Sequence, residues 1–470
     1  MRSRVLLTGF FWVVLAVAAL TGWTWGWREH KRANDADFLR HRLALIESDN
    51  GRLATLLSDR QLADAATGDR ARRTEIEQTV AQLRGLNFLR PVTYKEIPRA
   101  ELPAILRQKL AQQVPDQEFG DTSVSLAALG LLPAGLDLKK TYLDLLGEQI
   151  GAFYDQHSAE LFTFSGQPLD NGQNRVILAH ELTHALEDQH FHLARLPLET
   201  KGNDDRALAA SALVEGDATL VMSQYMLGDL SASSTRDMLA GSLSTDVRQL
   251  ASAPRYLRET LLFPYLRGQE FCQTLYQTGG WGALAAAFEH PPESTAEILH
   301  PGRFLARNAV SAVPIQLPGG ALLGQAPIGD NVLGEFGVRQ FLARWLKDDA
   351  QAERIAAGWT ADRYLVYGDA KASSYVWKSR WSSPRDAAEF AEAIERCWRE
   401  RFHLPPDAFQ GDAQTPGRSA SLPGGRCLLI ARSGEQVMVL DAQDARWKTA
   451  LMELLGTDPV PGSSFDGHAP

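Results

Sequence analysis

The apolar positions divide the first eighty or so residues into an uncharged run and a charged helical stretch. No charged residue lies between Val5 and Trp27, and this run is long enough to cross a bilayer. Residues 33–84 are charged, free of proline and rich in helix formers, with leucine and isoleucine recurring at a three-four spacing. They predict a helical stalk. The pattern fits either a short coiled coil, which would make a homodimer, or two separate helices interrupted at Asp49–Gly51.

From Leu86 onward the pattern is that of a globular domain in which helices predominate. Two stretches combine strand-forming residues with central turn residues, which predicts one hairpin over 152–166 and another over 426–442. A single entering strand is predicted within NFLRPVTYKEI, at 87–97. The helical patterns are ELPAILRQKLAQQ, the stretch from the first hairpin to about Glu289, FGVRQFLARWL after a proline-rich and glycine-rich loop at 313–331, and a terminal helix after the second hairpin.

Together these elements predict an α+β fold, predominantly helical with a small mixed sheet, preceded by an N-terminal transmembrane helix and a helical stalk. A chain of 470 residues, 44% of them hydrophobic, can bury a core of this size. The predicted boundaries are 1–32 for the membrane anchor, 33–85 for the stalk, 86–456 for the globular domain and 457–470 for a disordered tail rich in proline, glycine and serine.

The charges that flank the uncharged run bear on its orientation in the membrane. Arg2, Arg4 and the terminal amine favour an N-terminus inside the cell, whereas the basic residues at 28–32 compete with them from the far flank. Because a head of four residues usually stays inside, we expect a single-pass membrane protein. Its globular domain would then lie on the extracytoplasmic, periplasmic side.

Composition and charge exclude some partners. The net charge of -9 and the lack of long lysine and arginine runs argue against a nucleic-acid partner, whose phosphates would require a basic surface. The three cysteines, Cys272, Cys397 and Cys427, lie far apart and form no C-x-x-C pattern. They therefore indicate neither a thiolate metal site nor a disulfide framework.

The stretch VILAHELTHALEDQH, at 176–190, contains the pattern H-E-x-x-H. On a helix, His180 and His184 lie one turn apart on the same face, so both imidazoles can reach one metal ion while Glu181 stands beside them. This spacing predicts a zinc site with Glu181 as its general base. The alternative interpretation is an amphipathic helix whose polar residues face solvent.

A catalytic zinc ion needs a third protein ligand and one open position for water. Downstream, in ALVEGDATLV, Glu215 lies in an apolar helical context, where an unpaired acidic side chain is costly. We therefore expect His180, His184 and Glu215 to hold Zn²⁺. The other interpretation of Glu215 is a buried ion-pair partner.

This combination resembles the gluzincin class of zinc metallopeptidases, in which an HExxH helix is completed by a glutamate from a following helix. It is similar to poorly described bacterial metallopeptidases that read H-E-L-x-H-A-L-x-D-Q followed by E-G-D-A. The likeness extends more loosely over roughly residues 84–400, through LRGLNFLRPV, FPYLRGQEF, PPESTAEILHP and GWTADRY. The resemblance implies a zincin-like metallopeptidase fold and a protein or peptide substrate.

One position departs from the family pattern. Many gluzincins carry an acidic residue four positions after the ligand glutamate to orient a histidine, but Thr219 occupies this position here. Two other acidic residues are candidates for that role. Asp217 lies about 200° around a regular helix from Glu215, so it reaches a ligand histidine only where the helix is distorted or ends. Asp188 lies one turn beyond His184 on the same face.

Peptide hydrolysis also needs a group that stabilises the oxyanion formed at the scissile carbonyl. Tyr265 and His300 are the main candidates, and Tyr154 is a third. The structural alternatives are that Tyr265 anchors a helix start and that His300 caps a helix. The predicted function is a membrane-anchored zinc peptidase. Two other functions stay open: a catalytically inactive zincin-fold scaffold or binding protein of the envelope, and a zinc hydrolase of a non-peptide substrate.

Overall fold

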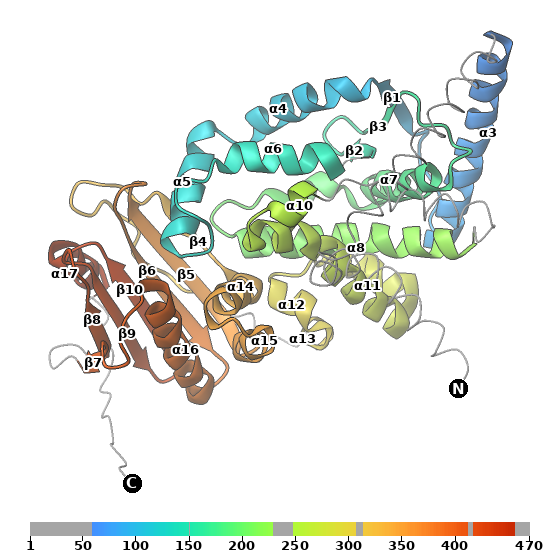
Figure 1. Ribbon diagram of the computed structural model, residues 1–470. Coiled ribbons are helices and arrows are strands. Elements are labelled where there is room, and N and C mark those ends of the chain that lie inside the picture. Colours follow the sequence, from blue (N-terminus) through green and yellow to red (C-terminus); the bar gives the residue numbers. More distant parts are fainter. Residues whose placement is uncertain (1–58, 150, 229–247, 307–313, 412–416, 456–470) are drawn as a thin grey trace, which may run out of the picture. The chain divides into compact units, whose positions relative to one another are not determined.

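The computed structural model describes residues 59–149, 151–228, 248–306, 314–411 and 417–455 (Figure 1). The predicted membrane anchor, the helix terminator at Asp49–Gly51 and the predicted tail lie outside these ranges, so the anchorage and location of the chain stay predictions. Within the described ranges, no helix is both long and apolar enough to cross a membrane. Helix α3 (Asp59–Arg84) covers the last part of the predicted stalk.

The chain falls into two compact units. The first consists of 1–78, 168–175 and 229–245, and the second of 79–167, 176–228 and 246–470. Among the described residues, the first unit holds most of α3 and the segment that leads into α7 (Gly172–Phe191). The second unit contains both sheets and the residues of the H-E-x-x-H motif.

The smaller sheet is built from three short strands, β1 (Thr93–Ile97), β2 (Phe153–Asp155) and β3 (Glu160–Phe164). β2 and β3 form an antiparallel hairpin, and β1 pairs with β3 in parallel, in the order β1-β3-β2. The hairpin predicted at 152–166 and the entering strand predicted within 87–97 are therefore confirmed. β2 is an outer strand of this sheet.

A helix covers one face of the smaller sheet. α4 (Leu102–Gln113) follows a single 3-10 turn, and its Leu102 packs in one small core with Ile97, Phe162 and Phe164. This packing fixes the hairpin that leads toward α7.

The middle of the chain is helical, as predicted. After α7 comes the long helix α8 (Asp204–Gly228), and later α11 (Arg255–Glu289), which is interrupted by non-helical backbone at Gly279 and Gly280. The shorter helices of this part are α5 (Asp116–Ala128), α6 (Leu138–Gln149), α10 (Arg248–Ser252), α12 (Thr295–Leu299) and α13 (Pro301–Leu305), with single turns at η1 (Arg99–Glu101), η2 (Leu193–Arg195) and η3 (Pro197–Glu199).

α8 and α11 touch along their backbones because two glycines meet between them. A Cβ atom on Gly216 would lie 2.3 Å from the carbonyl carbon of Gly268, and one on Gly268 would lie 2.1 Å from the carbonyl oxygen of Ala212. Only glycine permits so close an approach. Gly216 directly follows Glu215, and Tyr265 stands about one turn before Gly268, so this contact brings Tyr265 to the level of Glu215.

The larger sheet has seven strands, which are β4 (Gly329–Asn331), β5 (Trp359–Gly368), β6 (Ser373–Trp381), β7 (Gln410–Gly411), β8 (Arg418–Ser421), β9 (Cys427–Ser433) and β10 (Gln436–Ala442). Every neighbouring pair is antiparallel, in the order β4-β5-β6-β10-β9-β8-β7. β9 and β10 confirm the hairpin predicted at 426–442, and α17 (Ala445–Leu455) confirms the terminal helix.

Helices cover both faces of this sheet. On one face α14 (Gly334–Leu346), α15 (Asp349–Ala356) and α16 (Pro384–Phe402) pack against residues such as Val366 and Trp377. On the other face α17 packs against residues such as Leu365 and Val376. α14 confirms the helix predicted at FGVRQFLARWL.

The predicted fold class, predominantly helical with a small mixed sheet, is wrong. The chain is a mixed helix and sheet protein whose larger sheet is antiparallel and has seven strands. The long hairpin β5–β6 was missed because successive residues such as Leu365 and Val366 are buried on opposite faces. A strand that is covered on both faces gives a continuous apolar run in place of the alternation by which strands are found in a sequence.

Candidate metal centre

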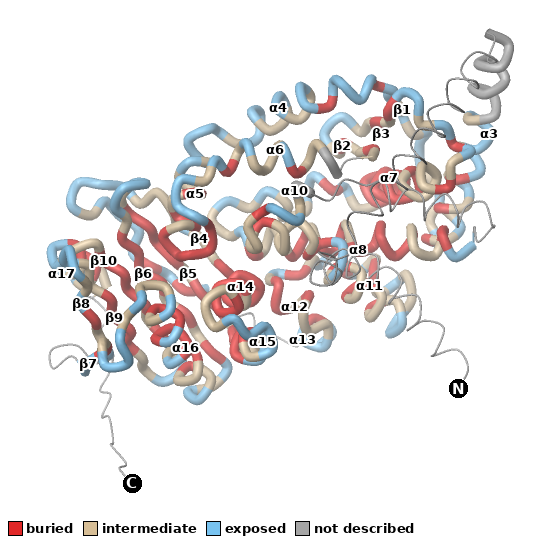
Figure 2. Tube along the Cα trace, viewed as in Figure 1, coloured by how far each residue is buried: buried red, intermediate tan, exposed pale blue. Residues whose placement is uncertain are grey.

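The helix that carries the H-E-x-x-H motif is buried on every side. All residues of α7 from Leu178 to Gln189 are buried, as Figure 2 shows for most of this helix. An amphipathic surface helix, the alternative that the sequence left open, would expose one face. Because buried polar side chains are costly unless they are paired, the histidines and acids of α7 need partners inside the protein.

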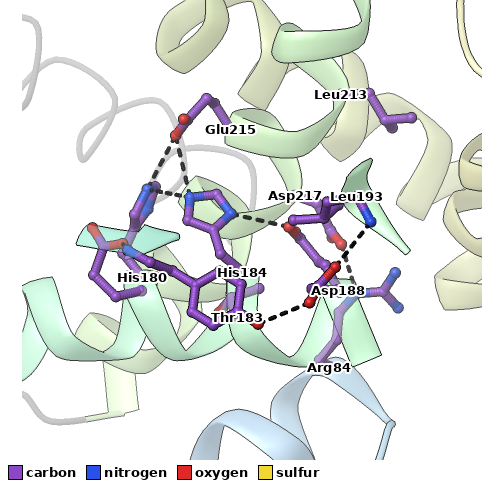
Figure 3. A network of polar contacts seen from close by, with 12 residues as sticks. Arg84, His180, Thr183, His184, Asp188, Leu193, Leu213, Glu215 and Asp217 are labelled. Atoms are coloured by element: carbon purple, nitrogen blue, oxygen red, sulfur yellow. Dashed lines mark hydrogen bonds and ion pairs between the residues drawn. The ribbon is translucent and has the colours of Figure 1, made fainter. Parts of the chain in front are cut away.

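The side chains of His180 and His184 on α7 converge with Glu215 on α8 (Figure 3). The two histidine Nε2 atoms are 3.1 Å apart, and Glu215 Oε2 lies 3.1 Å from His180 Nε2 and 3.4 Å from His184 Nε2. Tetrahedral ligands at about 2.0–2.1 Å from a zinc ion are separated from one another by about 3.3–3.4 Å. The spacing therefore fits zinc, and so do the donor types, two imidazole nitrogens and a carboxylate oxygen.

The electrostatics of these three residues favour a positive charge between their donor atoms. Burial alone would lower the pKa of His184, but the negative charge of Glu215 brings it well above its ordinary value of 6.5. Burial alone would raise the pKa of Glu215, yet the two imidazoles hold it far below 4.5. In both groups the opposite charge outweighs desolvation. A divalent cation would supply the positive charge that the cluster otherwise takes up as a proton.

Glu181 lies beside these residues and is held by the backbone of the smaller sheet. Its Oε2 accepts a 2.8 Å hydrogen bond from the backbone N–H of Tyr154 on β2. Because this N–H is directed at Glu181 and not at β3, the outer edge of β2 faces α7. Burial raises the pKa of Glu181 above its ordinary value of 4.5, which moves it toward the range of a general base.

The ring of His184 is held from its other side by Glu187, three residues further along α7. Glu187 Oε2 lies 3.0 Å from His184 Nδ1, and the glutamate side chain is fully buried. A carboxylate in this position fixes the ring so that Nε2 faces the other donors. No role for Glu187 could be predicted from the sequence, because a glutamate at this spacing is equally typical of a solvated helix face. By contrast, His180 Nδ1 is buried without a hydrogen-bond partner among the described residues.

Neither Asp217 nor Asp188, the two predicted orienting residues, is hydrogen-bonded to a ligand histidine in the described part of the chain. Asp217 Oδ2 instead accepts a 2.7 Å hydrogen bond from Arg84, and both side chains are buried. Asp188 accepts hydrogen bonds from the Tyr154 hydroxyl at 2.8 Å and from the Leu193 backbone N–H at 3.1 Å. Asp188 thus binds the side chain of Tyr154, and the backbone N–H of Tyr154 holds Glu181.

Of the two main oxyanion-stabilising candidates, Tyr265 lies at the candidate centre and His300 lies in a different cluster. The Tyr265 ring stacks on His180 with centroids 6.1 Å apart, and the residue is 42% exposed. The negative charge of Glu215 raises the pKa of Tyr265 well above 10, so the hydroxyl keeps its proton. His300 instead lies directly before α13, and its Nε2 is 2.6 Å from Oε1 of Glu335 on α14.

Comparison with known proteins finds a match in the C-terminal part of the chain. Residues 323–452 match a domain of unknown function (DUF8575). No curated protein and no solved structure matches the chain. The matched segment runs from before β4 into α17 and begins well after Glu215. The comparisons therefore assign no chemistry to the candidate metal centre.

Proposed function

We propose that the chain is a zinc-dependent peptidase, with His180, His184 and Glu215 as zinc ligands and Glu181 as the general base. The observation that carries the proposal is the convergence of three donor atoms that zinc prefers, 3.1–3.4 Å from one another, beside a buried glutamate. This donor set is the one that the resemblance to gluzincin-type metallopeptidases implies.

Each residue of the centre has a role in hydrolysis. When bound, zinc would supply Lewis-acid chemistry by polarising water and the substrate carbonyl. Glu181 accepts a proton from the water that attacks the peptide carbonyl and gives it to the departing amine. The Tyr154 N–H fixes Oε2 of this glutamate, which leaves Oε1 for the proton. The protonated hydroxyl of Tyr265 donates a hydrogen bond to the oxyanion.

The resemblance to gluzincin-type metallopeptidases supports a peptide as the substrate, and β2 lies beside the motif. β2 is the outer strand of the smaller sheet, and its outer edge faces the helix that carries the motif. The outward N–H of Tyr154 already binds Glu181, so an extended peptide that added to the sheet as a further strand would use the remaining backbone groups of this edge.

The test compares the wild type with Glu181→Gln and His180→Ala. Glutamine keeps the carbonyl oxygen that accepts from Tyr154 but cannot take a proton from water. We therefore expect Glu181→Gln to keep its zinc and to lose about 10²- to 10⁴-fold in hydrolysis of a quenched casein substrate. His180→Ala should lose both zinc and activity, because a ligand is missing.

The outcomes distinguish the peptidase from its alternatives. Equal hydrolysis by the wild type and Glu181→Gln would contradict the role of the base. Zinc bound by the wild type without hydrolysis of casein or of a peptide library would instead favour a scaffold or a hydrolase of another substrate.

A further inference from the structure

Arg84, the last residue of α3, is a buried arginine close to the candidate metal centre. Only 1% of its side chain is exposed, and its Nε donates to Asp217 Oδ2 at 2.7 Å. Burying an arginine is costly unless the pairing offsets the loss of hydration. Asp217 belongs to α8, the helix of Glu215, yet the hydrolysis described above gives this ion pair no task.

The end of α3 is shaped to place this side chain. Gly85 has a φ of 72°, in the left-handed region, and the Leu86 N–H donates to the Ala81 carbonyl at 3.1 Å, which closes the helix in a Schellman motif. A Cβ on Gly85 would lie 3.3 Å from the ring of Trp281. The guanidinium carbon lies 4.5 Å from the centroid of the Trp281 ring and 5.7 Å from that of Phe191, within cation–π range.

The segment after α3 is attached to the end of α7. Gln189 Oε1 accepts from the backbone N–H groups of Leu89 at 2.7 Å and Arg90 at 3.1 Å, and Gln189 Nε2 donates to the Arg90 carbonyl at 3.0 Å. His190 Nε2 donates to the Asn87 carbonyl at 2.8 Å. The buried end of α3 is therefore fixed relative to the helix that carries both ligand histidines.

From Arg84, a line of buried polar groups leads to His184. Asp217 accepts from Arg84 and lies near enough to Glu187 for the two charges to interact, and Glu187 Oε2 lies 3.0 Å from His184 Nδ1. Glu187 Oε1 and Asp217 Oδ1 are both buried without a hydrogen-bond partner among the described residues. Two buried carboxylates whose charges interact repel each other. The guanidinium supplies the positive charge next to both of them. Without it, the position of Glu187 would no longer be fixed.

We propose that Arg84 is a positioning residue for the metal centre: by holding Asp217 and Glu187 together, it fixes the ring of His184 with Nε2 toward the ion. This role depends on the zinc ligation proposed above. If the guanidinium is removed, the carboxylates turn apart, Glu187 stops orienting His184 and the zinc affinity falls. The stretch LRGLNFLRPV would thus support the metal centre, because it contains Arg84 and the backbone groups that bind Gln189 and His190.

The experiment measures zinc affinity by competition with a chelator for the wild type, Arg84→Met and Arg84→Lys. We expect Arg84→Met to lower the affinity about tenfold, the low end of the effect of residues that orient a metal ligand. Arg84→Lys should lose less, because it keeps the charge but not the planar guanidinium. The visible absorption of the Co²⁺-substituted protein should also change in Arg84→Met, since the histidine orientation changes.

A matched control separates positioning from simple stabilisation. Arg426, just before β9, also pairs with a buried aspartate, Asp441, with its Nη2 2.9 Å from Asp441 Oδ2. Arg426→Met should lower the Tm of the metal-free protein but leave the zinc affinity and the cobalt spectrum unchanged. Arg84→Met should change all three.

Several outcomes would overturn the proposal. Wild-type zinc affinity and an unchanged cobalt spectrum in Arg84→Met would leave Arg84 a purely structural ion pair. If Arg84→Met does not fold, Arg84→Gln decides, because it also removes the charge, and wild-type affinity and spectrum in that variant would equally contradict positioning. A wild-type protein that binds no zinc would overturn the metal centre itself, so the two failures are distinguishable.

Discussion

Removal of the Tyr265 hydroxyl isolates the stabilisation of the oxyanion from the other steps. Tyr265→Phe keeps the ring that stacks on His180 and removes only the group proposed as donor. Because the residue is 42% exposed, we expect the free energy of unfolding to change by less than about 0.5 kcal/mol. The loss of one oxyanion donor costs about 2.7–4 kcal/mol in the transition state. The kcat should therefore fall about 10²- to 10³-fold while KM hardly changes.

The assay determines kcat and KM of the zinc-loaded enzyme on a quenched peptide. Tyr276→Phe is the matched control, because Tyr276 lies on the same helix and packs on Trp281 with ring centroids 4.7 Å apart. It should keep the wild-type kcat. His300→Ala should also keep it, since His300 pairs with Glu335. An unchanged kcat in Tyr265→Phe would show that its hydroxyl does not stabilise the oxyanion, and a large loss in His300→Ala would assign this role to His300.

Two predictions concern the fold that supports the centre. Gly268→Ala should lower the free energy of unfolding by roughly 1–3 kcal/mol, because the new Cβ would lie 2.1 Å from the Ala212 carbonyl oxygen. The control is Gly282→Ala, where a Cβ would have no neighbour within 4 Å and the higher helix propensity of alanine should stabilise α11. Chemical denaturation measures the free energy of unfolding of both variants. If Gly268→Ala stabilised the protein as Gly282→Ala does, the close backbone contact would be contradicted. The contribution of Asp205 to stability should also fall as the pH rises from 3.8 to about 7, because burial raises the pKa of folded Asp205 to about 7, and the folded state keeps a proton that the unfolded chain loses. Above this pH window the loss from Asp205 approaches about 4 kcal/mol. The Tm measured at several pH values should therefore change less steeply with pH in Asp205→Asn than in the wild type. An identical dependence of Tm on pH in both would contradict the raised pKa of Asp205.

The residues that converge at the candidate centre could be predicted because their signals are local. The H-E-x-x-H spacing follows from the period of one helix, and an acidic residue in an apolar helical stretch, Glu215, is unusual by itself. The structure brings these three side chains within 3.4 Å of one another. The prediction needed one contact between distant parts of the chain, the contact between the helix of His180 and His184 and the helix of Glu215. Each of these helices already carried a recognisable residue pattern.

The partners of the centre could not be predicted, because their signals depend on contacts that are distant in the chain. Arg84 lies in the stretch predicted as a helical stalk, and its partner Asp217 is 133 residues away. Glu187 is distinguished from a surface glutamate only by the burial of all of α7. The larger sheet was missed for a related reason, since strands covered on both faces lack the alternation that marks a strand.

The zinc ligation proposed for His180, His184 and Glu215 can be observed in a crystal structure of the zinc-loaded protein, with an anomalous difference map at the zinc absorption edge. We expect one strong peak at about 2.0–2.1 Å from the Nε2 atoms of His180 and His184 and at about 2.0–2.2 Å from a carboxylate oxygen of Glu215. Glu181 should lie beside the peak without binding it. An absence of anomalous density between these three residues, or zinc held by a different set of side chains, would contradict the account.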